Sequence, residues 1–422
     1  MKTGYSKMKC GLIGERLGHS FSPMIHSHLA DYSYDLCELS RDELDSFMRS
    51  PAFDAFNVTI PYKKDVIPYL DYISPEAKAI GAVNTIVNKD GKLHGYNTDY
   101  FGFGYMLDVA GIDVCGKDTL VFGAGGTSLT ACAVLSNRGA KSVTVVSRAD
   151  NNPDFLASHA GAQIIVNTTP VGMFPKNLES VVDLSLFPNC EGVADVIFNP
   201  ARTALLLAAE KRGIPSVNGL PMLVAQAAKA FEFFTGDSSE PDCIDRITSI
   251  ISYQTRNIVL VGMPSCGKSR VGKLLAEKLG REFVDADEEF SKMHVITPAE
   301  AITTLGEDRF RELEHLTVCE LGKQSGLVIA CGGGVVTREC NYDPLHQNGT
   351  IIFLERDLDK LSSHGRPISK SVPIEELYAR RIDAYHRFAD MEVRSTEIPE
   401  KTAENMISEL NVADYGCAFC IG

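Results

Sequence analysis

The sequence predicts an α/β protein in which parallel sheets are covered by helices. Short apolar runs alternate with helical stretches through most of the 422 residues, which is the pattern of that class. Two glycine-rich turns follow apolar runs and precede helical stretches, the first at residues 123–126 and the second at 262–269. At about 100–200 residues per domain, a chain of this length predicts roughly two or three domains.

The first part of the chain alternates strands and helices. Apolar runs predict strands over 10–13 and 55–58, and helical patterns cover 24–32 and 76–80. This alternation indicates an α/β domain that begins near the N-terminus.

A second block starts near Tyr100 with a helix and continues as one βαβ unit. We expect a strand over 119–122, a helix over 128–138 and a strand over 142–146. The turn between the first strand and the helix has the composition of a dinucleotide-binding turn, in which glycines let the backbone approach a pyrophosphate at a helix N-terminus. Its candidate cofactor residues are Gly123, Ala124, Gly125, Gly126 and Thr127.

The end of the second strand of this unit indicates which dinucleotide binds. A strand that selects NAD carries Asp or Glu near this point to bind the ribose 2′-hydroxyl. Here the residues are Ser147 and Arg148, and an arginine suits a 2′-phosphate, so NADP is favoured. The alternative is an ordinary surface arginine at a strand end.

Further elements complete this block. Strands are expected over 163–166 and 192–197, and helices over 220–234 and 244–251. A polar, turn-rich stretch at 236–242 separates the two helices. We place the major boundary near Tyr253.

The second glycine-rich turn matches the phosphate-binding pattern G-x-x-x-x-G-K-[ST] in full. An apolar strand over 257–261 precedes it, and a helix over 271–279 follows, ending at Gly280. In such a loop Lys268 contacts the outer phosphates of a nucleotide and the Ser269 hydroxyl binds Mg²⁺. The candidate ATP-binding residues of the loop are Gly262, Pro264, Ser265, Cys266, Gly267, Lys268 and Ser269.

Composition limits the remaining possibilities. The formal net charge of −14 argues against binding nucleic acid through a basic surface. No apolar run is long enough to cross a membrane and none near the N-terminus has the form of a signal peptide. The 12 cysteines are scattered and are expected to be reduced thiols of a cytoplasmic protein. Cys417 and Cys420 form a lone C-x-x-C without a second ligand pair.

Five short motifs make residues 9–253 resemble the shikimate 5-dehydrogenase family. They are the stretches at 18–23, 57–63, 81–85, 97–99 and 218–226. The resemblance implies a two-lobed dehydrogenase with an α/β substrate domain and a Rossmann-like NADP domain, in which Gly219 also contacts the cofactor. It further implies substrate binding by Ser20, Ser22, Thr59, Lys63, Asn84, Asp99 and Gln226.

Lys63 and Asp99 are the catalytic pair that this resemblance implies. Hydride transfer to a ketone places negative charge on the carbonyl oxygen, and an ammonium group can stabilise that charge and supply the proton. Phe198 departs from the pattern, because the family usually has Tyr at this position.

Residues 257–395 resemble shikimate kinase, which implies a P-loop kinase domain with a parallel sheet. The motifs include Asp285-Ala286-Asp287, the run at 310–314 and the glycines at 332–334. By resemblance, shikimate is bound by Asp287, Arg311, Gly333 and Arg381. Asp287 orients the attacking hydroxyl, Asp285 lies near the metal with Ser269, and Arg366 closes over ATP. Arginine pairs suit a carboxylate substrate.

The two resemblances together predict a bifunctional enzyme. The first half reduces 3-dehydroshikimate to shikimate with NADPH, and the second phosphorylates shikimate with ATP and Mg²⁺, with Lys268 and Asp287 as catalytic residues. We expect the substrate domain at 1–100 plus 219–253, the NADP domain at 101–218 and the kinase domain at 254–422. Two alternatives remain: an NAD-dependent quinate/shikimate dehydrogenase in the first half, or a regulator that has lost catalysis. The oligomeric state is not predicted.

Overall fold

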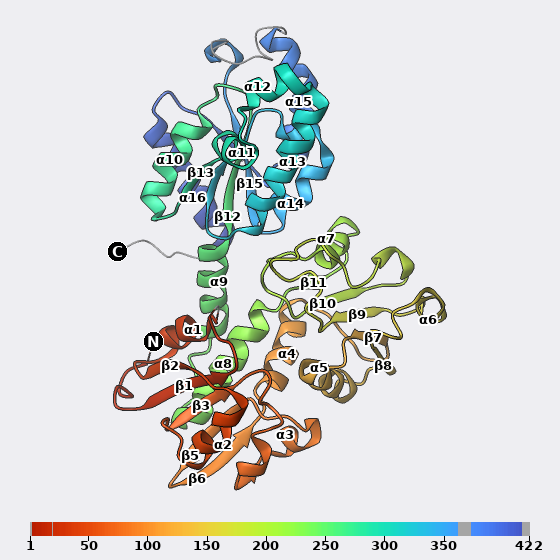
Figure 1. Cartoon of the computed structure of the whole chain (residues 1–422), viewed down its shortest axis with the longest axis vertical. Helices are drawn as coiled ribbons and strands as arrows, with labels where there is room; N and C mark the ends of the chain where they lie inside the picture. The colour runs from red at the N-terminus through yellow and green to blue at the C-terminus, as the bar shows by residue number, and fades with distance from the viewer. Residues whose placement is uncertain (1, 19, 362–372, 416–422) are drawn as a thin grey trace. The chain divides into compact units, whose positions relative to one another are not determined.

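The structure is a computed structural model that describes residues 2–18, 20–361 and 373–415, with side chains to residue 410. Its contacts divide the chain into two compact units. The first comprises Met1–Val171, Ser180–Phe198 and Ala208–Ile250, and the second comprises Gly172–Glu179, Asn199–Leu207 and Ile251–Gly422. Figure 1 labels the elements of both.

The first unit begins with a six-stranded mixed sheet in the order β2-β1-β3-β5-β6-β4. Its strands are β1 Lys9–Gly14, β2 Ser33–Glu38, β3 Ala55–Val58, β4 Tyr72–Ile73, β5 Thr85–Lys89 and β6 Lys92–Tyr96. Its helices are α1 Ser22–Leu29, α2 Arg41–Arg49 and α3 Pro75–Ile80. The two predicted strands and two predicted helices of this region are confirmed with small shifts at their ends. Strand β2 was not predicted because it carries no run of buried apolar residues.

The second sheet of this unit is entirely parallel, in the order β11-β10-β9-β7-β8. Its strands are β7 Asp118–Phe122, β8 Ser142–Val146, β9 Ile164–Asn167, β10 Gly192–Asp195 and β11 Ser216–Val217. The helices of this stretch are α4 Asp99–Val109, α5 Gly126–Asn137, α6 Pro153–Ser158, α7 Ala204–Lys211, α8 Leu220–Thr235 and α9 Cys243–Thr255. The parallel order and the glycine turn between β7 and α5 confirm the Rossmann-like prediction.

The second unit contains a five-stranded parallel sheet in the order β13-β14-β12-β15-β16. Its strands are β12 Asn257–Val261, β13 Phe283–Asp285, β14 Val328–Ala330, β15 Gly349–Glu355 and β16 Met391–Arg394. Its helices are α10 Lys268–Leu279, α11 Ala286–His294, α12 Pro298–Leu305, α13 Glu307–Lys323, α14 Tyr342–His346, α15 Ile374–Phe388 and α16 Pro399–Tyr415.

Helices cover both faces of this sheet (Figure 1). Because successive side chains of a strand point to opposite faces, Ile258 and Leu260 of β12 pack in a core cluster with residues of α10 and α16. Val259 and Val261 pack in a second cluster with residues of α13 and α15. A strand buried on both faces has a continuous apolar sequence, which is why β12 was predicted at its observed bounds.

Two short segments from earlier in the chain belong to the second unit. The Arg202 backbone N–H donates to the Gln347 carbonyl at 2.8 Å, and the Ala201 N–H donates to Asn348 Oδ1 at 2.8 Å. Asn177 Nδ2 donates to Gln347 Oε1 at 2.9 Å. Gln347 and Asn348 are buried, so these bonds satisfy polar groups that have lost contact with water. If the chain were cut near Tyr253, these hydrogen-bonded residues of the second unit would lie on two different polypeptides.

Candidate active sites

A cavity of about 460 Å³ lies in the first unit, where residues from both of its sheets meet. All seven residues expected to bind substrate line this cavity: Ser20, Ser22, Thr59, Lys63, Asn84, Asp99 and Gln226. Thr127 and Gly219, two of the expected cofactor residues, line it as well. The fold thus brings residues that are up to about 200 positions apart in the sequence to one concave site, as expected of a small-molecule site.

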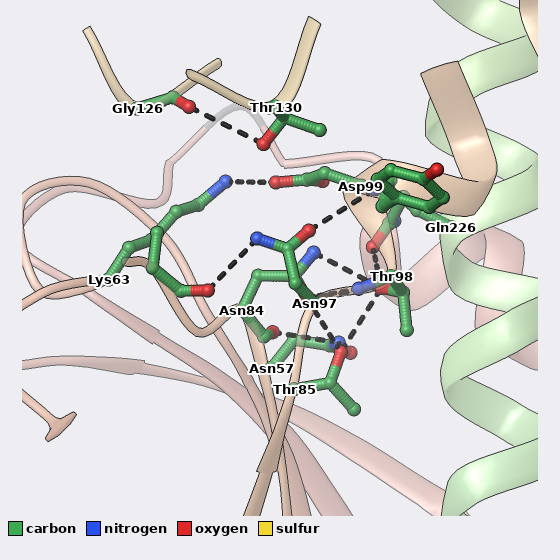
Figure 2. Close-up of polar contacts among 12 residues, drawn as sticks. Asn57, Lys63, Asn84, Thr85, Asn97, Thr98, Asp99, Gly126, Thr130 and Gln226 are labelled. Carbon is green, nitrogen blue, oxygen red and sulfur yellow. Dashed lines mark hydrogen bonds and ion pairs between the residues drawn. The ribbon is translucent and has the colours of Figure 1, made fainter. Parts of the chain in front are cut away.

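Lys63 and Asp99 form an ion pair inside this cavity. The distance from Lys63 Nζ to Asp99 Oδ2 is 2.6 Å, and the two side chains are 20% and 12% exposed. Figure 2 shows the ammonium group pointing directly at the carboxylate. Asp99 is the first residue of α4, and the Lys63 carbonyl accepts a bond from the Val83 N–H at 2.8 Å. Both groups are therefore held on short, anchored segments beside the cavity.

A buried hydrogen-bond network supports the carboxylate side of this pair. Asn84 Oδ1 accepts from the Thr98 N–H at 2.7 Å, and Asn84 Nδ2 donates to Thr98 Oγ1 at 3.1 Å. Thr98 Oγ1 also lies 3.4 Å from Gln226 Oε1, and Figure 2 shows Asn84 and Thr98 below Asp99. Because every member has a partner, the network fixes the rotamers around Asp99.

The two serines expected to bind substrate lie on the loop between β1 and α1. Ser22 is the first residue of α1 and is 8% exposed, and its N–H donates to Ser20 Oγ at 3.2 Å. Thr59 is held at the end of β3 by a bond from its N–H to the Ile13 carbonyl at 2.9 Å. Their hydroxyls can donate to or accept from a polar ligand.

The glycine turn after β7 requires glycine at its first position. Gly123 has a φ of 112°, and a Cβ there would lie 2.6 Å from Thr168 Oγ1. Helix α5 begins at Gly126, with Gly125 as its N-cap. Its N-terminal N–H groups, in the turn from Gly123 to Thr127, are thus available to a pyrophosphate. Gly219 has a similar constraint, since a Cβ there would lie 1.9 Å from the Val196 carbonyl oxygen.

The end of β8 holds the residues expected to distinguish the two nicotinamide cofactors. The Asp150 carboxylate accepts a bond from Ser147 Oγ at 2.5 Å and another from the Ser147 N–H at 3.2 Å. These two bonds hold the Asp150 carboxylate against the backbone and side chain of Ser147. Arg148 is exposed, and a cation in this position fits a 2′-phosphate.

The phosphate loop of the second unit joins β12 to α10 with two glycines in left-handed backbone. Gly262 has a φ of 149° and Gly267 of 105°, and a Cβ on Gly262 would lie 2.6 Å from the Leu354 carbonyl oxygen. Lys268 is 6% exposed. Its Nζ donates to the Gly262 carbonyl at 2.8 Å and to the Met263 carbonyl at 3.0 Å, so the ammonium group lies over the loop that is to hold the phosphates.

Ser269 and Asp285 fit a magnesium site. Ser269 Oγ donates to Asp285 Oδ2 at 2.6 Å, which places two hard oxygen ligands together at the loop. Asp285 Oδ1 also accepts from the Asp287 N–H at 3.0 Å and caps α11. Among the residues that the structure describes, no three His, Cys, Asp or Glu side chains form a cluster for a metal. Two protein oxygens are consistent with Mg²⁺, which obtains its other ligands from phosphates and water.

Two buried arginines converge on the glycines after β14. Arg381 Nη1 donates to the Gly333 carbonyl at 3.0 Å, and a Cβ on Gly334 would lie 2.1 Å from Arg311 Nη2. The side chains of Arg311 and Arg381 are about equally buried, at 5% and 6% exposure. Burial lowers the pKa of Arg381, and the Arg311 charge adds to this effect. Two buried cations close together favour an anionic ligand.

Glu314 balances part of this positive charge. Its carboxylate lies 2.7 Å from Arg311 Nη1. Burial raises the pKa of Glu314, while Arg311 opposes that rise. A Cβ on Gly332 would lie 3.0 Å from Asp287 Oδ1 and 3.2 Å from Glu314 Oε1, so Asp287 and Glu314 flank the same glycine. The expected shikimate residues Asp287, Arg311, Gly333 and Arg381 are thus assembled around one short loop.

Three residues that the structure places in these sites had no site role assigned from the sequence. Tyr385 is fully buried and donates from its hydroxyl to the Gly333 carbonyl at 2.5 Å. Thr98 connects Asn84 to Gln226, and Arg16 lines the first cavity. The expected lid residue Arg366 and the Cys417–Cys420 pair lie outside the described residues.

Comparisons with known families agree with the two sites. Residues 264–411 match the shikimate kinase family, and residues 12–86 match the shikimate dehydrogenase substrate binding domain. A shikimate dehydrogenase (NADP(+)) of Clostridium perfringens strain SM101 is 40% identical over 248 residues, which is 54% of this chain and 92% of the relative.

Solved structures give the same result for the first part of the chain. A shikimate 5-dehydrogenase from Thermus thermophilus, in complex with NADP(H) and shikimate, is 30% identical with a TM-score of 0.53. The match covers 57% of this chain and 98% of that one. A quinate dehydrogenase from Corynebacterium glutamicum, in complex with NAD, is 28% identical with a TM-score of 0.51, covering 57% of this chain and 97% of that one.

Proposed function

We infer that this chain, which belongs to the shikimate dehydrogenase family and continues into a shikimate kinase domain, carries two consecutive steps of the shikimate pathway. The first is the NADPH-dependent reduction of 3-dehydroshikimate to shikimate. The second is the ATP- and Mg²⁺-dependent phosphorylation of shikimate to shikimate 3-phosphate. The observation that carries this conclusion is the presence of both sites in one chain, since the product of the first is the substrate of the second.

In the first reaction we propose that Lys63 is the general acid. NADP(H) supplies the hydride when it is bound at the Gly123–Thr127 turn. Lys63 Nζ stabilises the charge that develops on the carbonyl oxygen and gives up its proton to that oxygen. Asp99, 2.6 Å away, holds the ammonium group in position. Asn84, Gln226 and the hydroxyls of the cavity bind the polar groups of the substrate.

In the second reaction we propose that Arg311 and Arg381 bind the shikimate carboxylate. Asp287, at the N-terminus of α11, accepts a bond from the attacking hydroxyl and orients it toward the nucleotide. Lys268 stabilises the phosphoryl group in transfer, and Ser269 and Asp285 hold Mg²⁺. The Ser269–Asp285 contact supports this assignment.

We also propose the limits of three functional domains: 1–100 plus 219–253 for the substrate domain, 101–218 for the NADP domain and 254–422 for the kinase. Within the described residues, no helix combines the length and apolarity needed to cross a membrane. A cytoplasmic location is proposed because both reactions use cofactors of that compartment and the ten described cysteines are free thiols.

One coupled assay tests the function. Purified full-length protein receives 3-dehydroshikimate, NADPH and Mg·ATP, and shikimate 3-phosphate is measured by mass spectrometry. We expect one phosphorylated product per NADPH oxidised when ATP is in excess. Without ATP, shikimate should accumulate instead. NADPH oxidation with no shikimate 3-phosphate would show that the second site is inactive. Quinate with NAD, supplied separately, tests the alternative dehydrogenase activity.

A further inference from the structure

A second cavity, of about 350 Å³, lies in the first unit. It shares no lining residue with the cavity that holds Lys63 and Asp99. Residues of α3, α4, α5 and α8 and of the end of β6, all labelled in Figure 1, form its wall. Its volume is that of a small-molecule site, and neither proposed reaction uses it.

Aromatic side chains give this second cavity its apolar character. Those of its wall are Tyr96, Tyr100, Phe101, Tyr105 and Phe233. The rings of Tyr96 and Phe233 stack with their centroids 4.0 Å apart, while Phe101 is 41% exposed. Because aromatic rings pack favourably on one another by face or edge, this wall favours a ligand with a planar ring.

The ring faces of this wall also accept positive charge. Lys229 Nζ lies 5.6 Å from the ring centroid of Phe101 and 5.5 Å from that of Phe233. A cation over an aromatic face is attracted by the negative side of the ring quadrupole. The same attraction is open to the ammonium group of a ligand.

One charged residue of the second cavity has no partner. Arg138 is paired with Asp108 by two hydrogen bonds of 2.5 and 2.8 Å, and Lys229 is paired with Glu232 at 2.8 Å. Glu76 lies in the first turn of α3 and is exposed. Among the residues that the structure describes, its carboxylate has neither a hydrogen bond nor an ion pair. The cavity thus offers a carboxylate to a cation, whereas its cations are already neutralised.

Two helices connect the second cavity to the catalytic residues. In α4, Phe101 lies two residues after Asp99. In α8, Lys229 lies three residues after Gln226. The two helices pack closely, since a Cβ on Gly102 of α4 would lie 2.6 Å from a backbone carbonyl oxygen of α8. A ligand in the second cavity therefore touches the helices that hold the substrate-binding side chains.

A ligand in this cavity also touches both halves of the first unit. Glu76 belongs to α3, which lies among the strands of the first sheet, and Val134 belongs to α5, which follows the first strand of the parallel sheet. A molecule held between them opposes movement of one half against the other. Such movements limit the turnover of many enzymes.

We propose that the second cavity is an effector site, which binds a small aromatic compound carrying an ammonium group and lowers kcat of the dehydrogenase. The ammonium group pairs with Glu76, and the ring packs against the aromatic wall. The binding is independent of the proposed function. The effect on kcat rests on that function, because it is measured on the dehydrogenase reaction.

Tyramine is the probe, because it joins a phenol ring to an ethylammonium group. Its Kd for the full-length protein is measured by ligand-observed NMR. The comparison compounds are 4-ethylphenol, which lacks the charge, and 3-(4-hydroxyphenyl)propionate, which carries a carboxylate instead. We expect tyramine to bind roughly fivefold more tightly than either, between the effects of an exposed ion pair and of a charged hydrogen bond. Saturating shikimate should not displace it.

Three variants locate the binding. Glu76→Gln should raise Kd for tyramine roughly fivefold and leave Kd for 4-ethylphenol unchanged. Phe101→Leu should weaken the binding of both compounds. Asp154→Asn is the matched control and should change neither, because Asp154 follows a proline in the first turn of α6, as Glu76 does in α3, but does not line the cavity.

The rate of shikimate oxidation with NADP⁺ gives the second readout. We expect saturating tyramine to lower kcat about twofold or more with KM for shikimate unchanged, because it restrains movement and leaves the substrate cavity open. No binding of tyramine, its displacement by shikimate or an unchanged Kd in Glu76→Gln overturns the site. An unchanged kcat overturns the effector role. Absence of shikimate oxidation without tyramine overturns the proposed function and the effector role, while the NMR titration still decides the binding.

Discussion

Replacement of Lys63 by alanine gives the sharpest test of the dehydrogenase chemistry. The Lys63 ammonium is the one basic group of the cavity that is paired with an acid, at 2.6 Å from Asp99. Loss of a general acid typically costs about 10²–10⁴-fold in rate, equivalent to about 2.7–5.4 kcal/mol at 1.36 kcal/mol per decade. We expect a decrease of that size in kcat/KM for 3-dehydroshikimate, followed by NADPH absorbance.

The same substitution also removes the partner of a largely buried carboxylate. Asp99 is 12% exposed, so its unpaired charge lowers the stability of the folded protein. Thermal unfolding of the variant must therefore be measured, to separate lost chemistry from lost folding. Asp99→Asn, which keeps the shape of the side chain and removes its charge, leaves Lys63 without its ionic partner and should give a smaller loss of rate.

Two internal controls accompany the Lys63→Ala experiment. Lys64 is the adjacent residue and is exposed, so Lys64→Ala should keep near-normal reduction. Phosphorylation of shikimate by the Lys63→Ala protein should also remain, because the second unit has its own core and its own loop. Near-normal reduction of 3-dehydroshikimate by folded Lys63→Ala protein would refute the assignment of Lys63 as the general acid.

Three further predictions concern other parts of the chain. Lys268→Ala should abolish phosphorylation in a coupled ADP assay and preserve NADPH oxidation, because the Lys268 ammonium group lies at the phosphate loop. Lys273 is an exposed lysine on the same helix, so Lys273→Ala should change neither activity. Arg148→Ala should lower the preference for NADPH over NADH roughly tenfold, and equal efficiency of the unmodified protein with both cofactors would contradict this. Burial lowers the pKa of His26 to about 3, so the unfolded chain binds a proton there more readily than the folded one. Between pH 7.5 and pH 5 this difference should lower the free energy of unfolding by about 2 kcal/mol, and His26→Gln should show a weaker pH dependence of Tm.

Much of the fold was predictable because the decisive elements are buried on both faces or begin at special turns. β12 was predicted at its observed bounds, since it is a buried apolar run before a recognisable turn. β8 was also predicted at its bounds, from its three valines, although it is only partly buried. Gly280 ends α10 in left-handed backbone, as expected of a helix C-terminus. Strands β2 and β6 were not identified, because half-exposed strands carry mixed polar and apolar residues. β5 was missed as well, because it also mixes polar and apolar residues although its first three residues are buried.

The candidate site residues were predicted from short motifs, but their geometry was not. The motif around Lys63 and the one around Asp99 are separated by some 36 positions, and nothing in their spacing shows that the two side chains meet. Arg16 was not singled out, because an exposed arginine in a loop has no distinctive local pattern. Its place in the site becomes visible only when the lining of the cavity is known.

The sequence by itself determined the α/β class, the two nucleotide-binding turns and the order of the two enzyme activities. Local chemistry is sufficient for these features, because a phosphate loop needs glycines with particular backbone angles and a lysine at one position. Tertiary structure alone decided which residues share a cavity, and that Gly172–Glu179 and Asn199–Leu207 belong to the second unit. The physical reason is that long-range hydrogen bonds, such as that from Ala201 to Asn348, depend on how distant segments pack and leave no periodic trace in either segment.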